Sequence, residues 1–293
     1  MQRVLFLGGA TSAGGRRGAS TSGSVPTTAM MLIVVSAIWS LAAAVGPAAE
    51  PLPRTNIVVH GLSSDRATAI RDHAERIRSR AFACLLGDDA PRPWLARCEI
   101  HVHPTAAAFA AAVGGAPDVA QGATTIEFTG AAVSLRRIDV MDGAGTIPDS
   151  LAHELVHVVL ADRFTTGPPP RWADEGLAVL FDAPEKQRGH DEDFRAAGRQ
   201  GIVWKAADLL ALEEYPEGSR RQRVFYGQSA ALVRWLIARR DAPTFIRFLE
   251  DCPHRGIRES LERHYELRSV EDLELAWSEV PAEEMLSLAE RSL

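Results

Sequence analysis

The run of residues 149–164 is mostly apolar, yet it contains two histidines and a glutamate. A helix is expected to begin near Asp149, because Thr146 and Asp149 are spaced like a capping box and a proline would lie in the first turn. On such a helix His153 and His157 lie one turn apart and project from the same face. Both imidazoles can therefore reach one metal ion, and Glu154 stands close enough to hydrogen-bond a water on that metal.

The pattern H-E-x-x-H is typical of zinc peptidases. A catalytic zinc takes a third protein ligand and leaves one position for water. Downstream, the segment 167–182 reads GPPPRWADEGLAVLFD, and Pro170 is well placed to begin a helix. Glu175 would lie on the buried side of that helix, where a carboxylate needs a partner, so it is the expected third ligand. The alternative is that Asp174 and Glu175 only favour the helix N-terminus electrostatically, a role that fits Asp174.

These residues carry a resemblance to a known family. "HELVH" followed by "RWADEGLA", within residues 146–240, resembles the gluzincin branch of zinc metallopeptidases, which have a peptidase MA-like domain. The resemblance implies that His153, His157 and Glu175 bind one zinc ion and that Glu154 is the general base in peptide-bond hydrolysis. The chain departs from the thermolysin-like pattern, because Val179 stands where that pattern has a carboxylate. It departs from the aminopeptidase pattern too, which commonly has asparagine just before the third ligand.

A tyrosine is the next candidate. In gluzincins a tyrosine downstream of the third ligand donates a hydrogen bond to the developing oxyanion, and Tyr226 resembles it. The sequence predicts an amphipathic helix from Gln228 to about residue 240, with Tyr226 at its start. Such a donor suits the reaction, because negative charge develops on the carbonyl oxygen in the transition state. The alternative is a tyrosine that packs a helix start, and Tyr215 and Tyr265 lie in weaker contexts.

Other histidines are weaker metal candidates. His101 and His103 alternate along an expected strand and share one of its faces. Without a third ligand nearby, such a pair is more often structural than metal-binding. His190 lies in a strongly charged segment that is expected to be a solvated loop.

The cysteines suggest one disulfide. A predicted turn between a helix and a strand separates Cys84 from Cys98, and this spacing can close a bridge in an oxidising compartment. The alternative is two buried free thiols. Cys252 is expected to be a small apolar residue in a helix.

The N-terminal residues 1–49 are expected to be a signal peptide or an anchor with its leader. Residues 30–46 contain no charged side chain, and this run is short for a membrane span but suits a signal-peptide core. Cleavage near Ala44 or Ala48 would satisfy the preference for small residues. If the segment is not cleaved, residues 30–46 would anchor the protein in the membrane. In either case the rest of the chain is expected outside the cytoplasm, secreted or periplasmic.

Residues 50–293 are expected to form one α+β domain. Strands are predicted over residues 55–60, 98–104, 124–128 and 132–140, with helices over 63–86 and 105–115. The last two strands are expected to be antiparallel neighbours. From residue 146 onward every element is expected to be helical, so a sheet-containing part (50–145) precedes a helical part (146–293). The resemblance to gluzincins implies that an edge strand formed by residues 132–140 binds an extended peptide.

The amino-acid composition and the distribution of charge indicate which kinds of partner the protein could bind. The chain has 293 residues, 46% of them hydrophobic, and a net charge of −6. It contains no block of like charge, so nucleic acid is not an expected partner. The expected function is that of a zinc-dependent peptidase acting on a peptide or protein. The alternative is a catalytically inactive module of the same fold that binds zinc or peptide.

Overall fold

The computed structural model describes residues 2–8, 55–87, 91–115 and 121–278. Most of the predicted leader, including the apolar run 30–46, lies outside these residues. Among the helices that are described, none is both long enough and apolar enough to cross a membrane.

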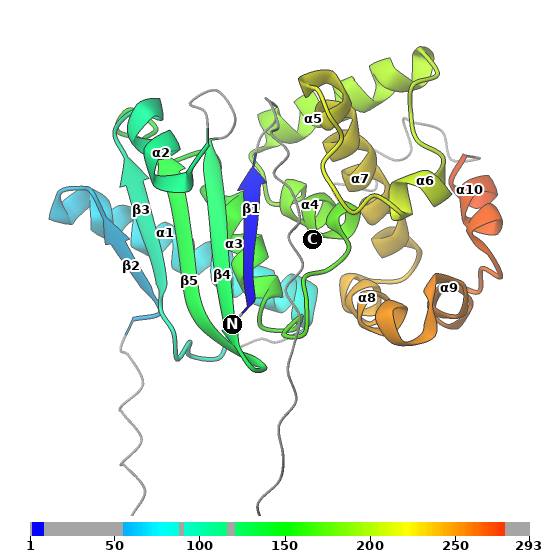
Figure 1. Cartoon of the computed structure of the whole chain (residues 1–293), viewed down its shortest axis with the longest axis horizontal. Helices are drawn as coiled ribbons and strands as arrows, with labels where there is room; N and C mark the ends of the chain where they lie inside the picture. Colours follow the sequence, from blue (N-terminus) through cyan, green and yellow to red (C-terminus); the bar gives the residue numbers. More distant parts are fainter. Residues whose placement is uncertain (1, 9–54, 88–90, 116–120, 279–293) are drawn as a thin grey trace, which may run out of the picture. The chain divides into compact units, whose positions relative to one another are not determined.

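A five-stranded mixed sheet forms the N-terminal half of the fold, in the order β1-β4-β5-β3-β2 (Figure 1). Strands β2, β3 and β5 are parallel to one another, whereas β4 is antiparallel to both β5 and β1. The predicted α+β class is confirmed, as are the four predicted strands and the antiparallel pairing of the last two. The bounds are β1 Gln2–Gly8, β2 Ile57–His60, β3 Cys98–His103, β4 Gly122–Thr129 and β5 Ala132–Met141.

Two features of this sheet were not predicted. Residues 2–8, which belong to the expected leader, form edge strand β1 and pair with β4 along their whole length. Strand β5 is not an edge strand, because it lies between β4 and β3. The expectation that residues 132–140 bind a peptide by strand addition is therefore wrong, since both backbone edges of β5 are already paired.

Helices cover the sheet unequally. Helices α1 (Ser64–Ala81) and α3 (Leu151–Leu160) pack behind it, while the short helix α2 (Ala106–Val113) lies on the other face (Figure 1). Side chains alternate along each strand, so one face of the sheet is buried and apolar. A π-helical turn, η1 (Phe82–Leu86), continues α1. The core between the sheet and these helices includes Ile57, Cys98, Ile100, Val102, Ile126, Phe128, Ile138 and Val140 from the strands, and Ile70, Leu155 and Val159 from the helices.

The second half of the described chain is helical, as predicted. Its longest helix, α7, packs against both α4 and α5 (Figure 1). The bounds are α4 Arg171–Val179, α5 Pro184–Arg199, α6 Ala206–Leu210, α7 Ser219–Arg239, α8 Ala242–Arg255, α9 Ile257–Tyr265 and α10 Val270–Ser278.

The structure corrects two predictions in this half. The segment around His190 is not a solvated loop but part of α5. This helix is held to α7 by buried Arg234, which pairs with Asp191 and donates to Gln187 Oε1 at 3.1 Å. In addition, α7 begins at Ser219 and not at Gln228, so Tyr226 lies inside the helix. The first two turns of this helix were not predicted, because the residues that precede Tyr226 are mostly polar or charged and show no apolar helical spacing.

The start of α3 also differs from the prediction. Thr146 does not cap the helix, because its Oγ1 donates to the carbonyl oxygen of Gly143 at 2.5 Å. The helix begins at Leu151, after Ser150. The predicted capping box is therefore wrong. The helix predicted to follow it is present and carries the H-E-x-x-H residues.

All three cysteines are free thiols in the structure, so the predicted bridge between Cys84 and Cys98 is not formed. Cys98 begins β3 with its side chain fully buried in the core. Burial raises the pKa of its thiol to about 12, which keeps it from forming the thiolate that disulfide exchange requires. Cys252 lies in α8 and packs against the apolar core, as predicted.

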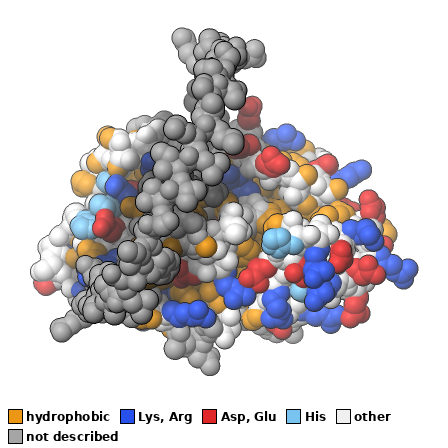
Figure 2. Space-filling view, turned by 60° about the horizontal axis from the view of Figure 1, so that its bottom comes forward, with side chains coloured by type: hydrophobic (Ala, Val, Ile, Leu, Met, Phe, Trp, Pro, Cys, Tyr) orange, Lys and Arg blue, Asp and Glu red, His pale blue; other side chains and the backbone are white. Residues whose placement is uncertain are grey.

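The outer surface of the helical half carries both signs of charge. In the face shown in Figure 2, acidic and basic side chains are interspersed over this half. Some of them form exposed ion pairs, such as Arg255 with Glu259 at 2.9 Å. Pairs of this kind contribute little to stability, about 0–1 kcal/mol each, so the apolar core and the buried polar contacts hold these helices together.

Candidate metal centre

Two buried helices bring the three predicted metal ligands together. His153 and His157 project from one face of α3, and Glu175 projects from α4. Nε2 of His153 lies 3.1 Å from Oε2 of Glu175, and Nε2 of His157 lies 3.9 Å from the same oxygen. All three donor atoms lie within 4.8 Å of one another. These residues could hold a metal ion, and each is at most 2% exposed.

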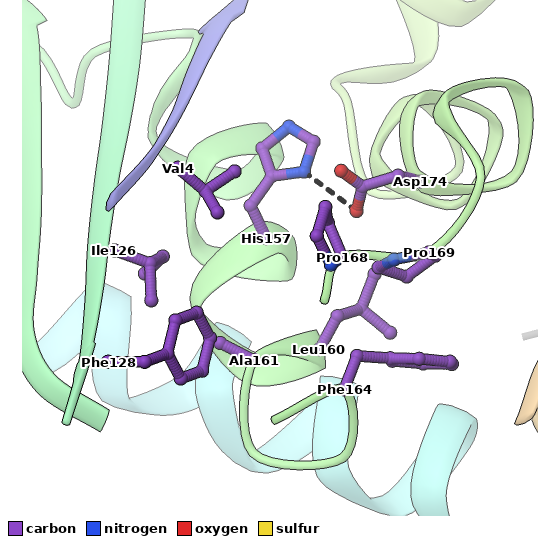
Figure 3. A pocket seen from close by; sticks show the side chains of 10 residues that line it. All are labelled: Val4, Ile126, Phe128, His157, Leu160, Ala161, Phe164, Pro168, Pro169 and Asp174. Carbon is purple, nitrogen blue, oxygen red and sulfur yellow. Dashed lines mark ion pairs between the residues drawn. The ribbon is translucent and has the colours of Figure 1, made fainter. Parts of the chain in front are cut away.

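Each of the two histidines has a carboxylate on its other ring nitrogen. Nδ1 of His153 lies 3.3 Å from Oδ2 of Asp182, and Nδ1 of His157 lies 3.1 Å from Oδ1 of Asp174 (Figure 3). A carboxylate in this position fixes the ring orientation of a metal-binding histidine and leaves Nε2 as the ligand atom. Asp174 is 1% exposed, so it orients His157 and does not merely serve the helix N-terminus.

The charge of this group favours a cation. Burial alone would lower the pKa of His153, but the carboxylates of Asp182 and Glu175 outweigh it and raise that pKa to about 10. Burial opposes Asp174 and Glu175 at His157 in the same way, and the carboxylates again raise the pKa. Three buried carboxylates thus surround two imidazoles. A divalent cation at the Nε2 atoms would neutralise this negative charge and displace the protons, so the donor set fits a metal.

Glu154 lies next to this ligand group and is fully buried. Its Oε2 accepts a hydrogen bond from Thr124 Oγ1 at 2.6 Å. Burial raises its pKa, although both histidines and Thr124 oppose the shift. Among the described residues, Oε1 of Glu154 has no hydrogen-bond partner. A buried carboxylate oxygen without a donor is costly, so this atom is suited to accept a hydrogen bond from water or from a bound molecule.

Gly122 in β4 makes room for Glu154. A Cβ at this position would lie 2.6 Å from Oε1 of Glu154 and 2.8 Å from Oγ of Ser150. Only glycine therefore lets the strand approach the carboxylate so closely.

We expect Gly122→Ala to displace the carboxylate of Glu154 while leaving the metal ligands in place. Any reaction that uses the Glu154 carboxylate should slow by about one to two orders of magnitude, since small misplacements of a reacting group are costly, and metal content should stay the same. Gly189→Ala is the control, because nothing lies within 4 Å of a Cβ there. Activity and metal content of both variants, measured side by side, check this. A Gly122→Ala protein that matches the wild type in both measurements would contradict this expectation.

Two tyrosines lie at the centre, and the sequence favoured only one of them. The hydroxyl of Tyr215 donates a hydrogen bond to Oε1 of Glu175. Burial and the nearby Glu175 carboxylate raise the pKa of Tyr215 well above its usual value, so it stays protonated as a donor. Tyr226 is buried with its ring centroid 6.3 Å from that of His153 and 6.4 Å from that of Tyr215. Tyr226 therefore lies beside the ligands, whereas Tyr215 contacts one of them.

Asp182 is held from its other side by α5. Lys186 Nζ lies 2.8 Å from Oδ1 of Asp182, and His190 Nε2 lies 3.8 Å from Oδ2. Burial lowers the pKa of His190 to about 4, so this ring is neutral near pH 7. Asp182, Lys186 and His190 were missed as site residues in the sequence. The one available signal was an aspartate that ends an otherwise apolar run after Glu175.

Close helix packing fixes the position of Glu175. Gly176 follows Glu175, and a Cβ there would lie 2.5 Å from Cγ2 of Val233 and 2.8 Å from the carbonyl oxygen of Ser229. The glycine thus lets α4 cross α7 in close contact. Glu175 is consequently positioned by α7 as well as by its own helix.

We expect Asp182→Asn to weaken metal binding by about 10–100-fold, because an amide supports the His153 ring less well than a carboxylate. The fold should persist, since asparagine has the same shape. Glu185→Gln removes a carboxylate from the same region but from the exposed first turn of α5, and should leave the affinity unchanged. Competition with a chromogenic chelator of divalent metals measures both affinities, and equal values for the two variants would contradict the role of Asp182.

The remaining histidine candidates lie on the outer face of the sheet. Nε2 of His103 lies 2.7 Å from Oδ1 of Asp139, so this histidine has a structural partner, as expected. His101 lies instead beside His60 and Glu99, and these three residues form a second group that could hold a metal ion. The sequence analysis grouped His101 with His103, its neighbour on the same strand. The neighbour of His101 in the second group is instead His60, which lies on a different strand and could not be found from spacing along one strand.

Comparison with protein-family models gives no match for this chain, and comparison with curated proteins gives none either. The candidate centre is therefore defined by its own residues and geometry.

Proposed function

We propose that this protein is a zinc-dependent peptidase. The observation that carries the proposal is the convergence of His153, His157 and Glu175 beside the buried carboxylate of Glu154. Two imidazole nitrogens and one carboxylate oxygen form a typical ligand set for catalytic zinc, which keeps a further position for water or substrate. When bound, zinc supplies a Lewis acid that lowers the pKa of water and polarises a carbonyl group.

In this scheme Glu154 moves the proton. Its Oε2 is held by Thr124, which leaves Oε1 to accept the proton of the attacking water. The raised pKa of Glu154 brings its basicity closer to neutral pH, as suits a group that must both accept and release a proton. The C–O bond forms as Glu154 takes this proton, and the C–N bond breaks afterwards, when Glu154 passes the proton to the departing amine.

The experiment that tests the proposal combines metal analysis with a broad substrate screen. Protein purified without added metal should contain about one zinc per chain at this buried centre and hydrolyse members of a quenched fluorescent peptide library. Removal of zinc with 1,10-phenanthroline should abolish hydrolysis, and added zinc should restore it. A zinc-containing protein that cleaves no peptide would instead support the alternative of an inactive binding module.

The two tyrosines are expected to respond differently to loss of the hydroxyl. Tyr226→Phe should keep the metal and lower kcat by about one to three orders of magnitude, the scale of a lost oxyanion donor. Tyr215→Phe should mainly weaken metal binding, because its hydroxyl contacts Glu175. Measuring kcat and zinc affinity for both variants separates the roles. An unchanged kcat in Tyr226→Phe would show that another group donates the hydrogen bond to the oxyanion.

A further inference from the structure

Strand β1 occupies the sheet edge nearest to Glu154. It pairs antiparallel with β4, from Gln2 opposite Phe128 to Gly8 opposite Gly122. Strand β4 is the one that contacts Glu154, through the Thr124 hydroxyl and the close approach of Gly122. Residue 6 of the chain, in β1, pairs with Thr124. The backbone of β1 therefore runs past the carboxylate that we propose as the base.

A substrate peptide must bring its carbonyl group to the same place. An exposed strand edge offers a row of backbone donors and acceptors, to which an extended peptide can add as a further strand. Without β1, the outer edge of β4 would be such an edge. We propose that this edge of β4 binds extended peptide and that β1 occupies it as a built-in competitor. This inference rests on the proposed peptidase function.

Of residues 3–5, the part of β1 whose side chains the structure describes, Val4 is the least exposed. Val4 lines a small apolar pocket together with Ile126, Pro168, His157 and Asp174 (Figure 3). On the opposite face of β1, Leu5 is 40% exposed. Arg3 on that face pairs with Glu127 at 3.8 Å, but the arginine is mostly exposed, so the pair adds little. Over residues 3–5, β1 is therefore held by its backbone pairing with β4 and by Val4, and another extended chain can supply both.

A strand of the same chain competes at a high effective concentration, so displacing β1 from the edge should favour an added peptide.

Two neighbouring substitutions in the full-length chain test this inference. Val4→Asp places a carboxylate beside Asp174, where β1 should no longer stay bound. Leu5→Asp makes the same change on the exposed side of the strand. We expect Val4→Asp to raise kcat/KM for an extended peptide substrate by about tenfold or more, and Leu5→Asp to leave it within about twofold. A Val4→Asp enzyme that is no faster than the wild type would overturn the inference while leaving the peptidase proposal intact.

A binding measurement separates this inference from the proposed activity. A fluorescein-labelled peptide with the sequence of residues 2–8 is titrated with protein that carries Glu154→Gln, so that no hydrolysis interferes. The anisotropy should rise with the Val4→Asp protein and stay low when Val4 is retained. This result supports the inference even if no peptide is ever cleaved. The absence of binding to either protein would overturn it.

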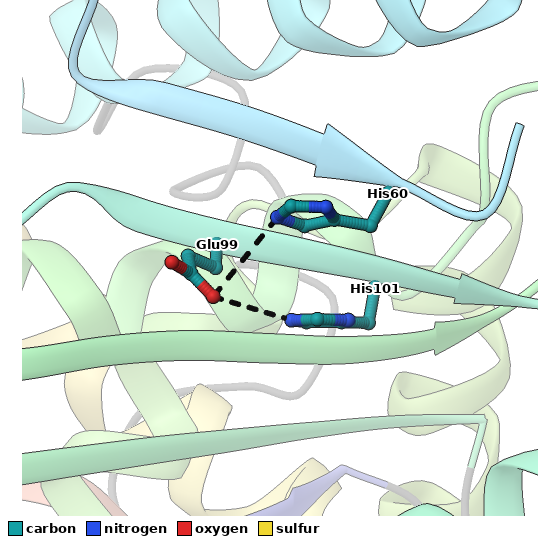
Figure 4. A group of neighbouring side chains, drawn as sticks. All are labelled: His60, Glu99 and His101. Carbon is teal, nitrogen blue, oxygen red and sulfur yellow. Dashed lines mark ion pairs between the residues drawn. The ribbon is translucent and has the colours of Figure 1, made fainter.

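A different observation supports a second metal site on the outer face of the sheet. His60 and His101 are direct partners in the pairing of β2 with β3, and Glu99 lies two residues before His101 on the same face (Figure 4). The two imidazole rings are stacked, with centroids 4.6 Å apart. Nε2 of His60 lies 4.0 Å and Nε2 of His101 lies 3.5 Å from the same carboxylate oxygen of Glu99.

Two imidazoles and a carboxylate that converge in this way suit zinc, nickel or copper(II). Nε2 of His101 is buried and makes no hydrogen bond within the described part of the chain. Arg137 lies nearby, but it donates two hydrogen bonds to Asp139, both at 2.7 Å. We infer that His60, Glu99 and His101 bind a divalent transition metal that remains open to solvent ligands.

Equilibrium dialysis against micromolar zinc chloride or copper chloride tests this second site. The wild type should bind one metal ion more per chain than His101→Ala and than His60→Ala. His103→Ala is the matched control, since His103 lies on the same strand face but is paired with Asp139, and it should bind as many ions as the wild type. Equal stoichiometry in His101→Ala and wild type would overturn the assignment. The result does not depend on peptidase activity.

Discussion

Glu154→Gln is expected to lower peptide hydrolysis by at least about a hundredfold, because it removes the only proposed general base and keeps the shape of the side chain. Zinc content should remain at about one ion per chain, since Glu154 is not among the three proposed ligands. The hydrogen bond to Thr124 can still form through the amide oxygen, so the fold should be unaffected. Atomic absorption and a quenched peptide substrate measure the two quantities on the same sample.

The combination of results is decisive here. If Glu154→Gln hydrolyses peptide as fast as the wild type, another group moves the proton and the proposed mechanism fails. If the variant loses zinc together with activity, Glu154 contributes to metal binding and its assignment as base alone is wrong. Glu185→Gln, in the exposed first turn of α5, is the matched control and should change neither quantity.

Replacing any one of His153, His157 or Glu175 with alanine is expected to remove both metal and activity. Each contributes one donor atom to a three-atom group, and two remaining ligands hold zinc far more weakly than three. Activity should fall by several orders of magnitude, because metal ion and positioned water are lost together. Metal content after gel filtration and hydrolysis of the same peptide measure the effect.

His254→Ala is the control for these variants, because His254 is exposed near the end of α8. It should retain full metal content and activity. If one ligand variant kept its zinc and its turnover, that residue would not be a ligand. Retention by Glu175→Ala would be the most informative of these outcomes, since Glu175 was chosen from its helix position and not from the H-E-x-x-H motif.

Local sequence patterns were sufficient to predict which buried residues form the group that could hold a metal ion. The spacing of His153 and His157 fixes their common face on any helix, so an error of a few residues in the start of α3 did not matter. Glu175 follows a proline that begins α4, and its apolar neighbours placed it on the buried side of that helix. Both predictions needed only helix geometry and the cost of burying a carboxylate.

The groups around the ligands could not be predicted in this way. Thr124 reaches Glu154 from a strand, Tyr215 reaches Glu175 from the loop after α6, and His190 approaches Asp182 from α5. None of these contacts has a fixed sequence spacing, because each depends on how separate elements pack. The same reason explains why β1 was missed: residues 2–8 form a strand only because β4, more than a hundred positions later, offers them an edge.

The three proposed ligands come from helices in different halves of the fold, so a bound metal ion would connect the two halves during local unfolding. His153 and His157 belong to a helix packed on the sheet, whereas Glu175 belongs to a helix locked against α7 at Gly176. A metal ion bound to all three must be released before these halves can separate. Amides in the middle of α7, which touch no metal, should therefore exchange hydrogen for deuterium more slowly in the zinc-loaded protein, because the opening that exposes them breaks metal bonds elsewhere.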